Sequence, residues 1–166
     1  MDLKKLTPGE MVISVSGIVL LIFSFFKWYG GGGGSVDVGG GNSIDVGSFS
    51  FNGWQAPSAF LSVVAILLGV VMAAHVITDK VAGVEMPERI GKVGWGVFYL
   101  AGGSIAFLFV LIKWLGNTSG TKIGIYVGLL STAGLAAGGF LVAKERGHLD
   151  ELTGGGAGAP PAPPAA

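Results

Sequence analysis

Four long stretches of the sequence contain no charged residue and no histidine. They cover residues 11–26, 56–74, 93–112 and 123–143, and apolar side chains dominate each of them. A helix needs about 20 predominantly apolar residues to cross the hydrocarbon core of a bilayer. With their flanks the four stretches approach that length, so the sequence predicts four transmembrane helices.

The composition favours the same class of protein. Charged residues make up 12% and hydrophobic residues 51% of the 166 residues, and the mean hydropathy is +0.70. Soluble domains are about a quarter charged, so these charges are too few to coat a soluble surface of this size. We therefore predict an all-α membrane protein whose four transmembrane helices form an antiparallel bundle.

Basic residues divide unevenly between the two predicted faces of the membrane. Cytoplasmic loops carry the excess of lysine and arginine, so the richer face is predicted to be cytoplasmic, together with both termini. The other three lysines lie next to helix ends, where they are expected to snorkel into water. The richer face has Lys4, Lys5, Lys80, Arg89, Lys92, Lys144 and Arg146, and the poorer face has Lys27, Lys113 and Lys122.

Helix start signals set the predicted boundaries. Thr7 and Glu10 have the spacing of a capping box, Pro57 and Pro87 open the second and third helices, and Thr121 is expected to cap the fourth. The predicted order is a cytoplasmic N-terminus (1–10), helix 11–29, an extracytoplasmic glycine-rich loop (30–56), helix 57–78, a cytoplasmic loop (79–92), helix 93–115, a short extracytoplasmic turn (116–121), helix 122–146 and a disordered cytoplasmic Gly/Pro/Ala tail (147–166).

The glycine-rich loop allows three interpretations. A phosphate-binding loop needs a Lys-Ser/Thr pair after its glycines, and none follows here. Calcium takes six to eight oxygen ligands, and Asp37 and Asp45 are two carboxylates, so whether they bind a cation stays open. The repeated SVDVG and SIDVG segments, joined by Gly-Gly-Asn, instead predict a short β-hairpin that leans on the membrane or on nearby aromatic residues.

No catalytic, cofactor or metal constellation is predicted. Cysteine is absent and the formal net charge is zero, which excludes thiolate chemistry and disfavours nucleic acid as a partner. Serine and threonine hydroxyls in the spans have no base at a similar depth, so we expect them to bond to helix backbone. His75 lies four residues before Asp79 and is expected to be satisfied by it, while His148 is expected to be solvated.

Small residues at helix-packing spacing are the main feature of the third and fourth spans. Because lipid does not drive helices together, close backbone approach between such residues does. Aromatic residues near the span ends are expected to anchor the helices at the membrane interfaces. The predicted packing residues are Gly102, Ala106, Gly124, Gly128, Gly134 and Gly138, and the predicted interface anchors are Trp28, Tyr29, Trp54, Trp95 and Trp114.

The segments FSFFKWYG and FNGWQAPSAF resemble a loose group of small four-helix integral membrane proteins of actinobacteria. In that group a phenylalanine-rich first span ends in a Trp-aromatic pair, matched here by Trp28 and Tyr29, and an Asn/Thr-x-Trp motif matched by Trp54 precedes the second span. The sequence departs from the group at Lys27, where a proline is often found. The resemblance implies a cell-envelope location and an exposed loop held down by Trp54.

These features predict a non-enzymatic multi-pass protein of the cell membrane. We expect it to act by helix–helix association, either as a homo-oligomer or with another membrane protein, with the lipid bilayer as its surroundings and without a cofactor. A small channel or carrier for a neutral or apolar solute is the alternative, because such a solute needs no charged residue inside the membrane.

Overall fold

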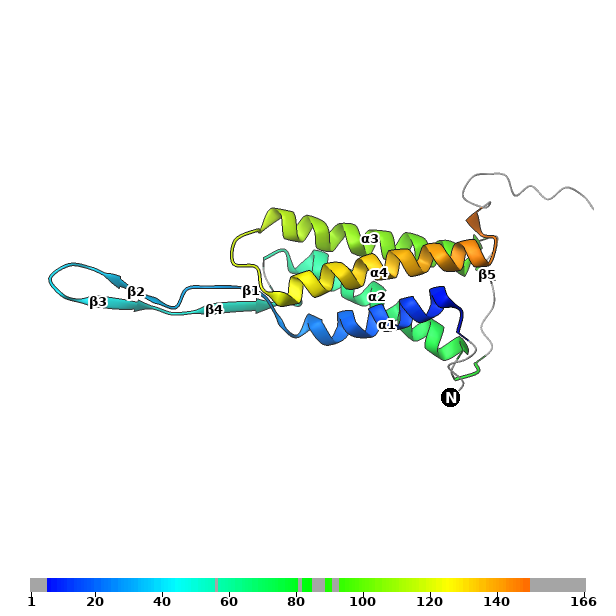
Figure 1. The fold of residues 1–166 in the computed structure, drawn as a ribbon, viewed down its shortest axis with the longest axis horizontal. Helices are drawn as coiled ribbons and strands as arrows, with labels where there is room; N and C mark the ends of the chain where they lie inside the picture. The colour runs from blue at the N-terminus through cyan, green and yellow to red at the C-terminus, as the bar shows by residue number, and fades with distance from the viewer. Residues whose placement is uncertain (1–5, 56, 81, 85–88, 91–92, 150–166) are drawn as a thin grey trace, which may run out of the picture.

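The computed structural model describes residues 6–55, 57–80, 82–84, 89–90 and 93–149. Four helices form a bundle, and a narrow two-stranded ribbon extends from one end of it, roughly along the helix axes (Figure 1). We call this end of the bundle the ribbon end and the opposite end the far end. The helices are α1 (Pro8–Ser24), α2 (Ala59–Lys80), α3 (Trp95–Gly116) and α4 (Ile123–Glu145).

Each helix packs mainly against two others. Helix α4 contacts α1 and α3, and α2 contacts the same two helices, so α2 and α4 lie on opposite corners of the bundle. Buried aliphatic side chains fill the space between the helices, among them Ile13, Leu20, Ile66, Val110 and Leu135. The sequence-based prediction of a helical protein with four helices is thus confirmed.

Among the described residues, three helices are long and apolar enough to cross a membrane, namely α2, α3 and α4. Helix α1 is equally apolar but has 17 residues. Its predicted start is confirmed: the Thr7 hydroxyl accepts from the Glu10 N–H, and the Glu10 carboxylate accepts from the Thr7 N–H. These two bonds satisfy N–H groups that have no partner within the helix.

The prediction that the first helix continues to Tyr29 is wrong. Helix α1 ends at Ser24, because polar groups of its last residue form hydrogen bonds with the chain that leads into α2. The Gly53 N–H donates to the Ser24 carbonyl over 2.8 Å, and the Trp54 indole N–H donates to the Ser24 hydroxyl over 2.9 Å. A carbonyl at a helix end needs such a partner, and here a segment distant in sequence supplies it.

The ribbon contains four short strands, which form two successive two-stranded segments. Strands β1 (Lys27–Gly31) and β4 (Phe49–Asn52) pair next to the bundle, and β2 (Gly34–Asp37) and β3 (Ser43–Val46) pair farther out. The predicted hairpin is therefore confirmed and is longer than the repeat alone indicates. Its outer part, β2 and β3, is exposed at every residue and does not lean on the aromatic residues as predicted.

The predicted cap of the fourth helix is wrong. Helix α4 begins after Lys122, and Thr121 is not its cap: it forms a backbone bridge with Tyr29 and a side-chain hydrogen bond with the Tyr126 hydroxyl. A small antiparallel pair, β5 (Arg89–Ile90) with β6 (Val93–Gly94), precedes α3, and no sequence signal indicates it. Pro87 and the tail from residue 150 onward lie outside the described residues.

Candidate functional site

The outer part of the ribbon has two chemically different faces. In an antiparallel pair, directly opposed residues lie on the same face and successive residues alternate. The pairs Val36–Ile44 and Gly34–Val46 therefore share one face, which we call the apolar face. The pairs Ser35–Asp45 and Asp37–Ser43 share the other, which we call the acidic face.

The side chains of the apolar face are open to the surroundings. Val36, Ile44 and Val46, together with Val38 at the start of the turn, are between 47% and 61% exposed. A two-stranded ribbon is marginally stable by itself in water. The outer ribbon thus carries four exposed β-branched side chains without support from the bundle.

The turn at the tip of the ribbon explains the second of the two glycine runs, residues 39–41. Gly39, Gly40 and Gly41 all have positive φ angles, between 70° and 86°, which other residues rarely adopt. The Asp37 carboxylate accepts from the Gly39 N–H over 2.9 Å and so helps to form the turn. Among the described residues, no group of three or more metal-ligating side chains occurs.

The inner part of the ribbon is fastened to the bundle by backbone hydrogen bonds. The Gly30 N–H donates to the Gly120 carbonyl over 2.8 Å, and the Lys122 N–H donates to the Trp28 carbonyl over 2.9 Å. Strand β1 thus pairs with β4 on one side and bonds to the α3–α4 turn on the other. The outer ribbon is exposed, but its base is held in place.

Trp28 is the main side-chain anchor of the ribbon, and it lies inside the protein. Its ring is fully buried, and its indole N–H donates to the Phe23 carbonyl over 2.9 Å. The interpretation of Trp28 and Tyr29 as membrane-interface anchors is wrong for this reason: both are buried in the core. Trp54, Trp95 and Trp114 are half-buried and leave part of each side chain on the surface.

The space for Trp28 is provided by two of the predicted packing glycines. A Cβ atom at Gly124 would lie 2.4 Å from Trp28 Cδ1, and one at Gly128 would lie 2.9 Å from Trp28 Cζ2 and Cη2. The GxxxG pair of α4 therefore receives an indole ring from the same chain. It does not form a free helix-packing face.

The other predicted packing residues also contact the same chain. A Cβ at Gly138 would lie 3.0 Å from the Gly9 carbonyl of α1, and one at Gly134 would meet the Ser16 hydroxyl. Ala106 is fully buried, and a Cβ at Gly102 would lie 3.3 Å from the sulfur of Met72.

The tightest α3–α4 contacts involve glycines that the sequence analysis does not select. A Cβ at Gly103 would lie 2.6 Å from the Ala136 nitrogen, and one at Gly139 would lie 2.5 Å from the Tyr99 carbonyl. The two helix backbones therefore touch at these points.

Lys113 is the most unexpected residue of the ribbon end. It is 1% exposed, which contradicts the prediction that it snorkels into water. Its ammonium donates to the Ser62 hydroxyl over 2.6 Å and to the Gln55 carbonyl over 3.4 Å. It also lies 5.4 Å from the centre of the Trp28 ring, within range of a cation–π interaction.

Lys113 and Tyr29 together connect α3 to the base of the ribbon. The Tyr29 hydroxyl donates to the Lys113 carbonyl over 3.0 Å. A phenol keeps its proton at neutral pH, and burial raises the pKa of Tyr29 to about 12, so this hydrogen bond persists into alkaline solution. The ribbon base is therefore bonded to α3, and through Lys113 and Ser62 α3 is bonded to α2.

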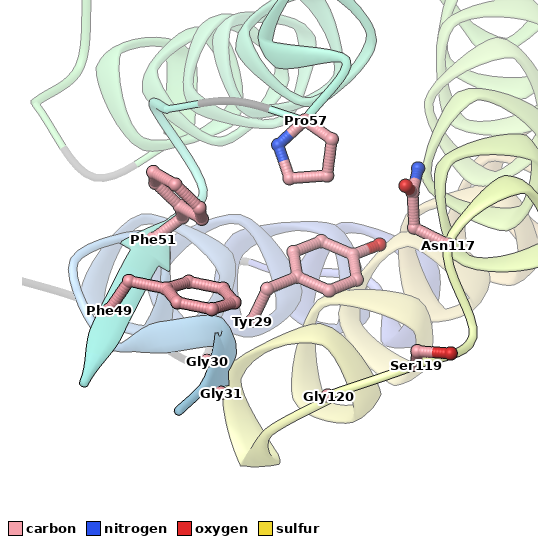
Figure 2. Close-up of a pocket in the computed structure, with 9 residues that line it drawn as sticks. All are labelled: Tyr29, Gly30, Gly31, Phe49, Phe51, Pro57, Asn117, Ser119 and Gly120. Carbon is pink, nitrogen blue, oxygen red and sulfur yellow. The ribbon is translucent and has the colours of Figure 1, made fainter. Parts of the chain in front are cut away.

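A pocket of about 400 Å³ lies beside Tyr29, between the ribbon base and the α3–α4 turn (Figure 2). Phe49, Phe51 and Pro57 form its apolar walls, and Asn117 and Ser119 supply polar groups on the opposite side. Glycine backbone of β1 and of the turn completes the lining. The pocket does not extend between the helices, because all of its lining residues belong to the ribbon end.

The far end contains two groups of polar contacts. Glu10 is 1% exposed and forms an ion pair with Arg146, which joins the start of α1 to the end of α4. The prediction that Asp79 satisfies His75 is wrong. His75 bonds through Nδ1 to the Tyr99 hydroxyl, while no hydrogen-bond partner contacts its Nε2 within the described part of the chain.

His148 also differs from its prediction. It is buried rather than solvated, and its Nδ1 accepts from the Gly96 N–H over 3.3 Å. A Cβ at Gly94 would collide with its ring, so the absence of a side chain there makes room for the imidazole.

The hydroxyl groups inside the bundle bond mainly to helix carbonyls. Ser14 donates to the Glu10 carbonyl and Thr132 to the Gly128 carbonyl, each over 2.9 Å, which confirms the expectation for these residues. Ser62 and Ser24 also accept: the Ser62 hydroxyl from the Lys113 ammonium, and the Ser24 hydroxyl from the Trp54 indole N–H.

Comparisons with protein-family models, with curated proteins and with solved structures found no match for this chain.

Proposed function

We propose that this protein spans the cell membrane with all four helices and acts, without catalysis, by binding another protein through the apolar face of its ribbon. The membrane part of the proposal is supported by the outer surface of the bundle. Leu130 and Phe60, for example, are 75% and 72% exposed. A helix of a soluble protein presents polar residues on its outer face.

Helix α1 supports a location in the membrane despite its length. Its exposed stripe consists of Met11, Val15, Ile18 and Ile22, which recur at helical spacing and are all apolar. At 1.5 Å per residue its 17 residues cover about 26 Å, close to the roughly 30 Å of a hydrocarbon core. Its buried stripe is no more apolar than this outer one, which suits lipid rather than water.

The proposed orientation places the ribbon outside the cell and both termini in the cytoplasm. Seven of the ten basic residues belong to the far end by sequence. Of the three at the ribbon end, Lys113 is buried in protein, which leaves Lys27 and Lys122 exposed there. The positive-inside rule then favours a cytoplasmic far end.

The observation that carries the association is the uncovered apolar face of the ribbon. The glycine faces of α3 and α4, which the sequence predicts to mediate association, already receive Trp28 and neighbouring helices. The ribbon is the part of the described chain that combines exposed β-branched side chains with freedom from the bundle. Binding there would cover surface that the chain itself leaves open.

A photoreactive amino acid on either face of the ribbon tests the proposal. Val36 lies on the apolar face, and its neighbour Ser35 lies on the acidic face at nearly the same height. We expect crosslinks from residue 36 to protein in intact cells, and few from residue 35. Equal crosslinking from both positions, or no protein crosslink from residue 36, would refute association through the apolar face.

Binding of a small apolar compound is a second candidate function, which the pocket beside Tyr29 supports. Its volume of about 400 Å³ and its aromatic walls fall within the range of small-molecule sites. Because the pocket stays at the ribbon end, it favours binding over passage through the bundle. We expect a ligand to raise the thermal stability of the purified protein.

A pair of matched variants tests this second candidate. Ser119→Trp should fill the pocket and abolish the stabilisation, whereas Thr118→Trp, at an exposed position outside the pocket lining, should retain it. If no compound of a broad apolar panel stabilises the parent protein, or if both variants respond alike, the pocket is not a binding site.

A further inference from the structure

The ribbon presents a surface whose shape is suited to a second copy of itself. Its apolar face contains two rows of opposed residues, Val36 with Ile44 and Gly34 with Val46. The second row is uneven, because Val46 projects from the face while a Cβ built at Gly34 would meet nothing within 4 Å. Each ribbon thus carries a projection and an empty space side by side at the same height.

We propose that two copies of this protein pair through the apolar faces of their ribbons, related by a two-fold axis along the membrane normal. This inference rests on the proposed function and names the partner. Two copies inserted in one membrane in the same orientation can be related only by an axis along its normal. Ribbons that follow the helix axes, as in Figure 1, then stand at the same height and run side by side.

Such an axis brings unlike positions into contact. Rotation by 180° about an axis parallel to the ribbons places β2 of one copy opposite β3 of the other. The height of each residue along the axis does not change. Val46 of one copy therefore meets Gly34 of the other, and Ile44 meets Val36. Val46 of each copy therefore fills the space at Gly34 of the other. Such an interface is isologous, because both subunits contribute the same patch.

The acidic face explains why the opposite pairing does not occur. Asp37 and Asp45 both lie on it, so pairing through these faces would bring four carboxylates together. Like charges in direct opposition destabilise strand contacts. When the apolar faces meet, all four carboxylates point away from the interface into water.

The interface is small and therefore depends on the membrane. Four exposed side chains per copy, Val36, Val38, Ile44 and Val46, cover less area than the roughly 800 Å² per partner of a standard interface. Confinement of both copies in one bilayer raises their effective concentration and compensates for a weak contact. We expect pairing of the full-length protein in membranes and none for an isolated ribbon peptide.

The pairing predicts which single cysteines react together. The chain contains no cysteine of its own, so two differently tagged copies can each carry one. With a short bismaleimide, Val36→Cys in one copy should crosslink to Ile44→Cys in the other, because these positions face each other. Ser35→Cys with Asp45→Cys, the equivalent pair on the acidic face, should crosslink at background level.

Two glycine variants provide a matched test of the projection and the empty space. Gly34→Val should weaken the Val36–Ile44 crosslink by about tenfold or more, because it fills the space that Val46 needs. Gly47→Val is the control, since Gly47 also has open space around its Cβ position and no positive φ. Equal effects of both variants would overturn the predicted register.

The outcomes separate this inference from the proposed function. If residue 36 photo-crosslinks only to other proteins and tagged copies do not crosslink, self-pairing is wrong and association stands. If residue 36 reaches only lipid, both fail. If the acidic-face cysteines crosslink as well as the apolar-face pair, the two-fold arrangement is wrong.

Discussion

The contact between Trp28 and Gly128 allows a quantitative test of how the ribbon is anchored. Trp28→Ala removes a fully buried indole and its hydrogen bond to the Phe23 carbonyl. A buried Trp-to-Ala change costs about 3–5 kcal/mol, and the lost hydrogen bond adds about 1 kcal/mol. Unfolding of the purified protein in mixed micelles of mild detergent and SDS measures this loss.

Gly128→Leu perturbs the same contact from the other side. The new side chain would collide with Trp28 ring atoms that lie 2.9 Å from the Cβ position, and the ring cannot move because it is buried. Overpacking of this kind costs about 1–3 kcal/mol or more. The higher helix propensity of leucine recovers at most about 1 kcal/mol. We therefore expect a net loss of stability.

The double variant, Trp28→Ala with Gly128→Leu, decides between packing within the chain and packing between chains. If the introduced leucine side chain occupies part of the space left by the indole, the double variant will be more stable than the sum of the single losses predicts, by about 1–3 kcal/mol. Gly116→Leu, at a position with nothing within 4 Å of its Cβ, should be nearly neutral. Additive single effects would refute the contact, as would a Gly128→Leu protein that unfolds like the parent and loses only self-association.

Three further outcomes are expected. Lys113→Met keeps the volume of the side chain and removes the desolvation cost of its charge, so in SDS titration its stability should stay within about 1 kcal/mol of the parent. Lys113→Ala should cost about 2–5 kcal/mol. Equal losses in the two variants would contradict this. Thr7→Ala should cost about 1 kcal/mol in the same titration, because it removes the cap of α1, and no change would rule out the cap. The raised pKa of Tyr29 contributes stability that is complete below about pH 10 and is lost as the pH rises toward 12. Tyr29→Phe should therefore flatten the decline of the denaturation midpoint between these pH values, and an unchanged slope would contradict this expectation.

Local signals predict the parts of the fold that depend on neighbouring residues. The capping box of Thr7 and Glu10 and the turn of the hairpin each involve groups within a few residues of one another, and both are observed. The helices predicted at 57–78, 93–115 and 122–146 also agree with α2, α3 and α4 to within two residues at each end, because hydrophobic runs of that length form helices in either a membrane or a protein core.

The base of the ribbon could not be predicted because its contacts join distant segments. Lys-Trp at the end of an apolar run is typical of a membrane interface, and the sequence alone does not show that Gly124 and Gly128 make room for Trp28. The end of α1 at Ser24 depends likewise on Gly53, which donates to it from the chain segment directly after β4. Contacts between residues so far apart in sequence depend on tertiary packing and not on local propensity.

One signal for the buried lysine is present in the sequence. Lys113 follows Ala106 by seven residues and Val110 by three, so it continues the buried stripe of α3 at helical spacing. The rule that lysines near span ends snorkel outweighs this periodicity in the sequence-based prediction. Helical phase is thus a better guide than proximity to the helix end for this residue.

Labelling of two single cysteines with a membrane-impermeant maleimide tests most directly whether the chain spans the membrane with its ribbon outside. Ser43→Cys lies in the exposed outer ribbon, and Lys80→Cys lies at the far end of α2. The account predicts that residue 43 reacts in intact cells and that residue 80 reacts only after the membrane is opened. Reaction of both residues in intact cells, or of residue 80 alone, would contradict it.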